Sequence, residues 1–202
     1  YAVPERFGTL VFVTGPAQEP VRVVRQIADP PMPTIVPQPQ RVQAGSGVVR
    51  ITARTPVVVA PDLDTVGAEM LLADLKGRFG LQLQITRGTP GPAGIGVRVD
   101  ATDSALKPEG YRLTAGGERV EIVGKDPRGA FYGLQTLRQM VTEDDQGPLV
   151  HACTIEDWPD IAWRGWHLSG PLQADLDTYH RFIDLLALLK FNQLCLEVNG
   201  NL

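Results

Sequence analysis

The sequence has few of the residues that build disulfide frameworks and metal sites. It holds two cysteines and three histidines in 202 residues. Cys153 and Cys195 lie in strand-like apolar stretches, which predicts two buried small hydrophobic side chains, with a disulfide or a reactive thiol as alternatives. Cysteine usage therefore does not define the redox compartment. The histidines, His151, His167 and His180, have no metal-ligand spacing, so we predict no metal and no other cofactor.

An excess of basic residues and a long apolar run are also missing. The net charge is −4 and no basic stripe occurs, which argues against a nucleic-acid partner. The longest apolar run is too short to cross a bilayer. No Gly-x-Ser-x-Gly elbow is present, and the Gly94-Ile95-Gly96 triplet precedes a strand pattern instead of following one. These observations disfavour a serine hydrolase and a dinucleotide-binding protein.

The two ends of the chain read as cuts through a longer protein. The chain begins at Tyr1 without a signal peptide and stops at Leu202 after a strand pattern. Two runs rich in β-branched residues, 10–13 and 21–24, flank a turn and predict a hairpin within residues 1–28. We assign this hairpin to the end of a preceding β segment.

Prolines and glycines, by contrast, are abundant, and they punctuate the rest of the chain. Five prolines in residues 29–40 predict an extended linker. Residues 41–150 then alternate strand and helix patterns. Apolar positions at helical spacing predict a helix from Asp62 or Asp64 to about Phe79, where Gly80 ends it. The expected strands are 48–51, 57–59, 81–86, 95–99, 111–113 and 120–122, the last two joined by a hairpin turn at residues 116–117.

A second helix is predicted after residue 125. Asp126 is a suitable N-cap, and Pro127 fits the first helical turn. An apolar stripe follows, and residues 144–147 are expected to end the helix. We expect Phe131 and Leu134 to be buried against the sheet together with other apolar residues, namely Ala130, Leu137 and Val141.

Residues 151–202 read as a βαβ unit. The expected strands are 152–155, 161–168 and 193–198, and a strongly apolar helix covers 176–189. Two strands joined by a crossover helix are normally parallel. Arg164 would lie on a buried strand and would need a charged partner, for which Asp157 and Asp160 are candidates.

Three segments resemble glycoside hydrolase family 20, the β-N-acetylhexosaminidases. Residues 35–39 (Ile-Val-Pro-Gln-Pro) are similar to the proline motif that opens the accessory domain of that family. Residues 129–139 (Gly-Ala-Phe-Tyr-Gly-Leu-Gln-Thr-Leu-Arg-Gln) are similar to its signature helix, and residues 155–159 with 163–165 to its entry into the first barrel strand. Residues 182–184 and 189–192 continue the match, so the resemblance covers residues 33–199.

The resemblance implies an α/β fold. Residues 29–150 would form an α/β sandwich, the zincin-like hexosaminidase accessory domain of one sheet with two helices. Residues 151–202 would be the first βαβ unit of a TIM barrel that is truncated here. Gly129 and Gly133 would let the signature helix approach the sheet closely.

The resemblance also implies a retaining hydrolase of terminal N-acetylhexosamine, in which the acetamido oxygen of the substrate attacks the anomeric carbon. An adjacent Asp-Glu pair on the fourth barrel strand assists it. No Asp-Glu dipeptide occurs in this sequence, so we expect the chain itself to be inactive, with no catalytic residue. His167, Glu197 and Asn199 lie at the carboxyl ends of the two barrel strands and are the candidate substrate-binding residues. A carbohydrate partner and a secreted or periplasmic location follow from the resemblance alone.

The sequence departs from the family at three positions. Ser169 stands where an Asp is expected and Leu172 where an Arg is expected. The second strand usually carries a His and then Asp residues, whereas residues 195–200, ending at Gly200, have neither here. An enzyme of the O-GlcNAc hydrolase type therefore stays open as an alternative. A non-catalytic carbohydrate-binding or interaction module is the second alternative.

Overall fold

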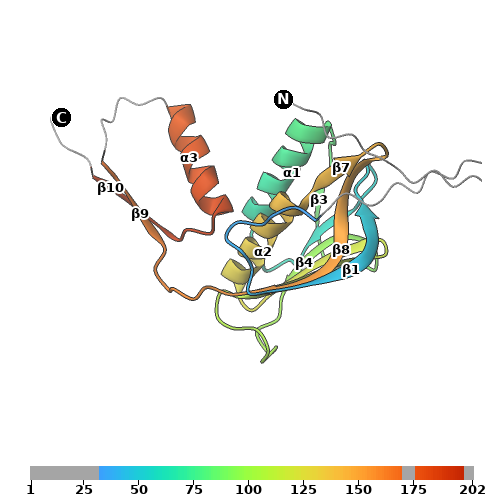
Figure 1. Ribbon diagram of the computed structural model, residues 1–202, viewed down its shortest axis with the longest axis horizontal. Helices are drawn as coiled ribbons and strands as arrows, with labels where there is room; N and C mark the ends of the chain where they lie inside the picture. Colours follow the sequence, from blue (N-terminus) through green and yellow to red (C-terminus); the bar gives the residue numbers. More distant parts are fainter. Residues whose placement is uncertain (1–31, 170–175, 198–202) are drawn as a thin grey trace, which may run out of the picture. The chain divides into compact units, whose positions relative to one another are not determined.

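The computed structural model describes residues 32–169 and 176–197, which belong to one of two compact units, residues 32–202 (Figure 1). The hairpin expected within residues 1–28 lies outside the described residues. The described part is a mixed α/β fold with one large sheet, a separate two-stranded sheet and three helices. None of the described helices is long and apolar enough to cross a membrane.

The large sheet has eight strands. Its order is β1-β8-β5-β6-β4-β2-β3, and β7 pairs with β8 beside that path. The pairs β4–β6, β2–β4 and β2–β3 are parallel, whereas β5 and β8 pair antiparallel with their neighbours. The strand bounds are β1 (Arg41–Arg50), β2 (Val57–Val59), β3 (Ile85–Arg87), β4 (Gly94–Val99), β5 (Tyr111–Gly116), β6 (Arg119–Gly124), β7 (Thr142–Asp144) and β8 (Gly147–Asp157).

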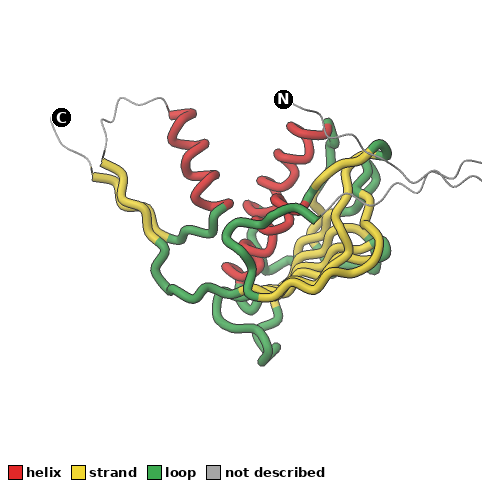
Figure 2. Tube along the Cα trace, in the orientation of Figure 1, coloured by secondary structure: helices red, strands yellow, loops and turns green. Residues whose placement is uncertain are grey.

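Two helices pack together on one side of this sheet, α1 (Val66–Phe79) and α2 (Pro127–Met140) (Figure 2). The left-handed conformation of Gly80 ends α1, as its sequence predicts. The predicted start of α1 at Asp62 or Asp64 is wrong, because Thr65 is the N-cap residue. Asp64, one residue earlier, accepts from the N–H of Val66. The Asp126 side chain accepts from Gly129 N–H at 2.9 Å and Pro127 opens α2, so both predicted features of this cap are confirmed.

Glycines set how closely α2 lies to the sheet. A Cβ atom at Gly133 would lie 2.5 Å from Cγ2 of Ile122 in β6 and 3.2 Å from the Tyr111 ring in β5. At Gly129 it would overlap the carbonyl oxygen of Gly110. The predicted close approach is therefore confirmed at both positions.

The prediction for Phe131 is wrong. Phe131 is only partly buried, and Leu134, although buried, lies with it beside Gly67 of α1. The apolar stripe of α2 is wide enough to cover both the sheet and the neighbouring helix, and a helical period does not say which side faces which partner. Tyr132, instead of Phe131, is the buried aromatic residue of the pair.

Further strand and helix ends differ from those predicted from the sequence. The helix α2 stops at Met140, and residues 142–147 form the β7–β8 hairpin instead of a helix end. β3 begins only at Ile85, because it pairs with three residues of β2 and cannot extend further. β1 starts seven residues before the predicted strand, because its exposed, glycine-containing first half pairs along β8, a partner that local sequence does not reveal.

The last segment is the predicted βαβ unit. β9 (Gly165–Ser169) and β10 (Gln193–Glu197) are parallel neighbours, joined through α3 (Leu176–Leu188). The sequence predicts that the βαβ unit begins after residue 150. The strand β8 crosses this position and continues to Asp157 within the large sheet. The Trp-rich strand expected over residues 161–168 begins only at Gly165. The prediction of two buried thiols is confirmed for Cys153 and wrong for Cys195, which is exposed at the strand β10.

Candidate functional site

The two-stranded sheet presents one face to α3 and the other away from it. The Trp166 ring packs on Phe182 of α3 and on Phe191, with centroid separations of 5.8 and 6.1 Å. Because side chains alternate along a strand, the next residue, His167, points away from α3. The register pairs His167 with Cys195 and places Glu197 two residues further along the same face.

Two of the three predicted substrate-binding residues meet on this face. His167 Nε2 lies 3.5 Å from Glu197 Oε2, and their side chains are 58% and 49% exposed. The contact is an ion pair only when the imidazole is protonated. Asn199, the third predicted residue, lies outside the described residues, as do Leu172 and Gly200.

A hollow of about 370 Å³ lies beside His167. It offers imidazole, amide and indole groups, which can hydrogen-bond to and stack on a small polar molecule. Within the described ranges, no group of three His, Cys, Asp or Glu side chains is placed to hold a metal ion. The hollow is lined by Trp163, Gly165, Trp166, His167, Gln193, Leu194 and Cys195.

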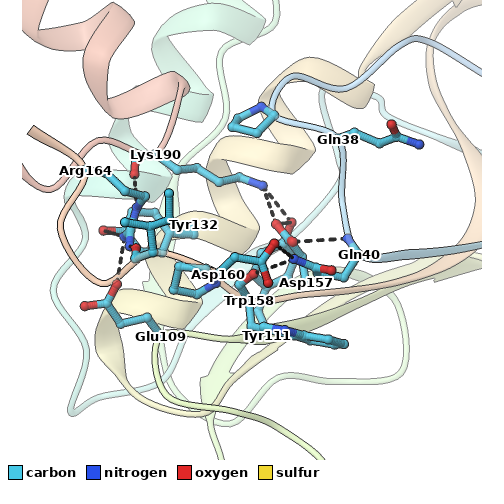
Figure 3. Close-up of a pocket in the computed structure, with 13 residues that line it drawn as sticks. Gln38, Gln40, Glu109, Tyr111, Tyr132, Asp157, Trp158, Asp160, Arg164 and Lys190 are labelled. Carbon is cyan, nitrogen blue, oxygen red and sulfur yellow. Dashed lines mark hydrogen bonds and ion pairs between the residues drawn. The ribbon is translucent and has the colours of Figure 1, made fainter.

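A second polar cluster lies where the βαβ segment meets the large sheet (Figure 3). Arg164, just before β9, donates from Nη2 to Glu109 Oε2 at 2.7 Å and to the Tyr132 hydroxyl at 3.0 Å. Burial raises the pKa of Glu109, but hydrogen bonds from Arg164 and Arg128 outweigh it and hold this pKa below its usual value. The carboxylate therefore stays charged and paired at neutral pH.

The predicted partner of Arg164 is wrong. Neither Asp157 nor Asp160 binds it, and its carboxylate partner is Glu109, in the loop before β5. Asp157 instead binds a second cation, Lys190, with Nζ 2.7 Å from Oδ2. The sequence carried one signal for this pair, because Lys190 directly follows an apolar helix and a lysine buried there needs an anionic partner.

Lys190 and Asp157 share a buried tyrosine. The Tyr111 hydroxyl lies 3.0 Å from Lys190 Nζ, 3.1 Å from Asp157 Oδ2 and 2.5 Å from Thr136 Oγ1. Burial lowers the pKa of Lys190, and the Asp157 charge opposes that change only in part. Burial, together with the same carboxylate, raises the pKa of Tyr111 well above 10. The network thus holds one ion pair and a neutral phenol.

A pocket of about 210 Å³ opens over these two clusters (Figure 3). Figure 3 shows the Lys190 chain reaching across the pocket to Asp157, while Arg164 turns toward Glu109 on the other side. Trp158, Pro159 and Ile161 add apolar surface.

Comparison with known proteins decides the family. A family model described as glycosyl hydrolase family 20, domain 2, matches residues 32–158, which hold the entire eight-stranded sheet with α1 and α2. The chain belongs to glycosyl hydrolase family 20. The β-N-acetylhexosaminidase of Cellulomonas fimi is 34% identical over 173 residues, which are 83% of this chain and 34% of that protein.

Other family-20 relatives agree. The β-hexosaminidase of Porphyromonas gingivalis is 30% identical over 168 residues, covering 79% of this chain and 22% of that protein. The structure of the family-20 β-N-acetylhexosaminidase from Streptomyces coelicolor matches with a TM-score of 0.70 and 32% identity, over 83% of this chain and 35% of that one. The chain therefore spans about a fifth to a third of the length of these relatives.

Proposed function

We propose that this chain is the amino-terminal part of a retaining β-N-acetylhexosaminidase. Its eight-stranded sheet with α1 and α2 would be the zincin-like accessory domain, and β9-α3-β10 would be the first βαβ unit of a TIM barrel. The observation that carries the proposal is sequence similarity, which extends through the large sheet. The match to the Cellulomonas fimi enzyme covers 83% of the present chain. The parallel pairing of β9 and β10 supports the barrel assignment.

In the proposed reaction the substrate supplies the nucleophile. Its acetamido oxygen attacks the anomeric carbon and forms a bond there while the bond to the leaving oxygen breaks. A Glu protonates the leaving oxygen and an adjacent Asp orients the acetamido group. No Asp-Glu dipeptide occurs in these 202 residues, so the catalytic pair would come from a later strand.

His167 and Glu197 would line the sugar site. They lie on the face that points away from α3, which is the inner face when strands close into a barrel. An imidazole and a carboxylate 3.5 Å apart can donate to and accept from adjacent hydroxyls of a pyranose. Asn199, outside the described residues, stays a predicted member of this site. The structure of a Streptomyces plicatus β-hexosaminidase mutant with GlcNAc, 32% identical to this chain, supports a sugar ligand.

The chain by itself is expected to be inactive. It lacks the carboxylate pair and most strands of the pocket, and loss of a general acid alone typically costs about 10²–10⁴ in rate. The test compares this chain with the full-length protein on an aryl N-acetylglucosaminide, with release of the aryl alcohol measured and the product anomer followed by NMR. We expect turnover with retention only from the full-length protein.

Three outcomes would contradict parts of this proposal. Turnover by the short chain would mean that the active site is misplaced. Inversion by the full-length protein would rule out acetamido-assisted attack. Hydrolysis of another glycoside in place of N-acetylhexosaminides would assign Ser169 and Leu172 to a different specificity. On family resemblance we also propose a secreted or periplasmic location, which a fractionation of the producing cells would test.

A further inference from the structure

Arg164 joins the two parallel strands at their starting points. Its N–H donates to the Asn192 side chain at 2.9 Å, and its carbonyl oxygen accepts from the N–H groups of Asn192, at 2.9 Å, and Gln193, at 3.3 Å. The Asn192 amide also donates to Ala162 at 2.8 Å. The backbone of Arg164 therefore opens the hydrogen-bond ladder between β9 and β10.

The Arg164 side chain binds the loop before β5 and the helix α2. Nη2 binds Glu109 and Tyr132, Nε donates to the Lys190 carbonyl at 2.8 Å, and Nη1 donates to the Ile161 carbonyl at 2.8 Å. A planar guanidinium with several donors in fixed directions can hold such a crossing, whereas the point charge of a lysine cannot. One residue thus links β9, the start of β10 and the large sheet.

Two further ties hold the same segment. Lys190, just before β10, binds Asp157 at the end of β8. On α2, Arg138 binds Asp184 of α3 at 3.1 Å, and Gln139 donates to the Leu188 carbonyl at 3.2 Å. The βαβ segment is therefore anchored on the signature helix α2 and on the strand β8.

The pocket above these ties does not look like a ligand site. Its carboxylates Glu109 and Asp157 are paired with Arg164 and Lys190, and Asp160 accepts from the Gln40 amide at 2.7 Å. Among the described residues, no buried side-chain atom of this pocket is left without a hydrogen-bond partner. Both cations are thus taken up by carboxylates, and Asp160 is held by a neutral amide, so the cluster stabilises a junction and leaves no cation free for a ligand.

We infer that Arg164 is a positioning residue for the sugar site, which it holds in place through its bond to Glu109, in the loop that leads into β5 of the accessory sheet. This inference rests on the proposed function. His167 follows Arg164 by three residues, or about 10 Å of extended chain. A tilt of β9 and β10 at their anchored starts moves His167 and Glu197 together, and a shift of about 1 Å at a reacting group can cost about 10²-fold in rate.

The test uses the full-length protein and three variants. Arg164→Lys keeps the positive charge but loses the planar guanidinium group with its several donors. Glu109→Gln weakens the partner of Arg164 in the accessory domain. Arg128→Gln is the matched control. Arg128 binds the same Glu109 carboxylate at 2.9 Å from an exposed position, and within the described residues it forms no hydrogen bond or ion pair with β9 or β10. We expect kcat/KM on an aryl N-acetylglucosaminide to fall about 10- to 100-fold for Arg164→Lys, with KM raised. Arg128→Gln should change it less than twofold.

The change in KM separates positioning from simple loss of folded protein, because a smaller folded fraction lowers the apparent kcat and leaves KM unchanged. Combining Arg164→Lys with Glu109→Gln should cost little more than Arg164→Lys alone, since both act on one bond. An unchanged KM for Arg164→Lys, or equal losses for Arg164→Lys and Arg128→Gln, would overturn the inference.

A failure of the proposed function gives a different result. If the unmodified full-length protein hydrolyses no N-acetylhexosaminide, the reaction is wrong and the kinetic test no longer applies. Amide hydrogen exchange in the 202-residue chain then decides whether Arg164 anchors the strands. Faster exchange in β9 and β10 for Arg164→Lys, with α2 and Arg128→Gln unchanged, supports the anchor, and uniform exchange in all variants refutes it.

Discussion

At the scale of single residues, glycines decide how the signature helix meets the sheet. Gly129 and Gly133 stand on α2 where a side chain would meet Gly110 or Ile122. Gly77, on α1, has no atom within 4 Å of the position its Cβ would take. The same substitution should therefore have opposite effects in the two helices.

We expect Gly133→Ala to lower the free energy of unfolding by about 1–3 kcal/mol, because the added methyl group forces Ile122 and Tyr111 to move. Gly77→Ala should raise it by about 0.5–1 kcal/mol, because alanine reduces the backbone entropy of the unfolded chain without meeting a neighbour. Urea unfolding followed by far-UV circular dichroism measures both values. Stabilisation by Gly133→Ala would show that α2 lies further from the sheet than described.

Helix caps formed by adjacent residues could be predicted from the sequence at three positions, whereas partners far apart in the sequence could not. Asp126, Pro127 and Gly80 cap their helices as the sequence indicates, since a cap depends on three or four adjacent residues. The sequence also predicted that Arg164 needs an anionic partner. Its partner was not, because Glu109 lies 55 positions away in a loop with no pattern of its own.

At the scale of elements, the β7–β8 hairpin is tied to β1 by an ion pair. Arg50 donates to both carboxylate oxygens of Asp144, at 2.5 and 2.6 Å. These hydrogen bonds lower the pKa of Asp144 to about 2, against a usual value near 4. Since the pKa is lower in the folded protein, the pair contributes stability above about pH 4, and this contribution is lost as the pH falls toward 2.

We therefore expect the free energy of unfolding to fall between about pH 5 and pH 2, with a shallower slope for Asp144→Asn. Some slope should remain, because Glu109 and Glu156 also have lowered pKa values. Asp145→Asn, one residue further in the hairpin turn, is the control and should leave the slope unchanged. Denaturant unfolding across this pH range measures it. Identical slopes for the parent chain and Asp144→Asn would contradict the pair.

The type of each helix or strand could be predicted from the sequence pattern, whereas the ends of the strands depend on the strands that they pair with. The helical period predicted α1, α2 and α3, and the β-branched run predicted β2. The length of β1, the late start of β3 and the hairpin after Met140 depend on which strand lies alongside. Of the candidate site, the sequence placed His167 and Glu197 at neighbouring strand ends. It indicated that a buried Lys190 needs an anion, but not that this anion is Asp157 or that Tyr111 joins the pair.

At the scale of the whole molecule, the βαβ segment leaves large apolar side chains in solvent. Trp163 is 74% exposed and Ile161 66%, and Leu196, Ile183 and Leu185 are about half exposed. Apolar side chains gathered on one segment mark a surface that another surface covers. In the proposed full-length enzyme, the remaining barrel would cover it.

We expect this 202-residue chain to self-associate at micromolar concentration and to bind a hydrophobic dye such as ANS. Replacing Trp163 and Ile161 by serine should reduce both effects, because these are the most exposed of the large apolar side chains. Sedimentation velocity and dye fluorescence provide the two measurements. A monodisperse monomer that binds no dye would contradict this expectation.

Because the two thiols differ in exposure, one of them can be labelled selectively. Burial raises the pKa of Cys153 to about 11, which keeps it as the unreactive thiol at neutral pH, while Cys195 is open to solvent on β10. A maleimide fluorophore at pH 7 should therefore attach at Cys195 alone, and Cys195→Ser should abolish the fast reaction. The dye would then sit beside His167, where its emission would report directly on whatever comes to occupy that hollow.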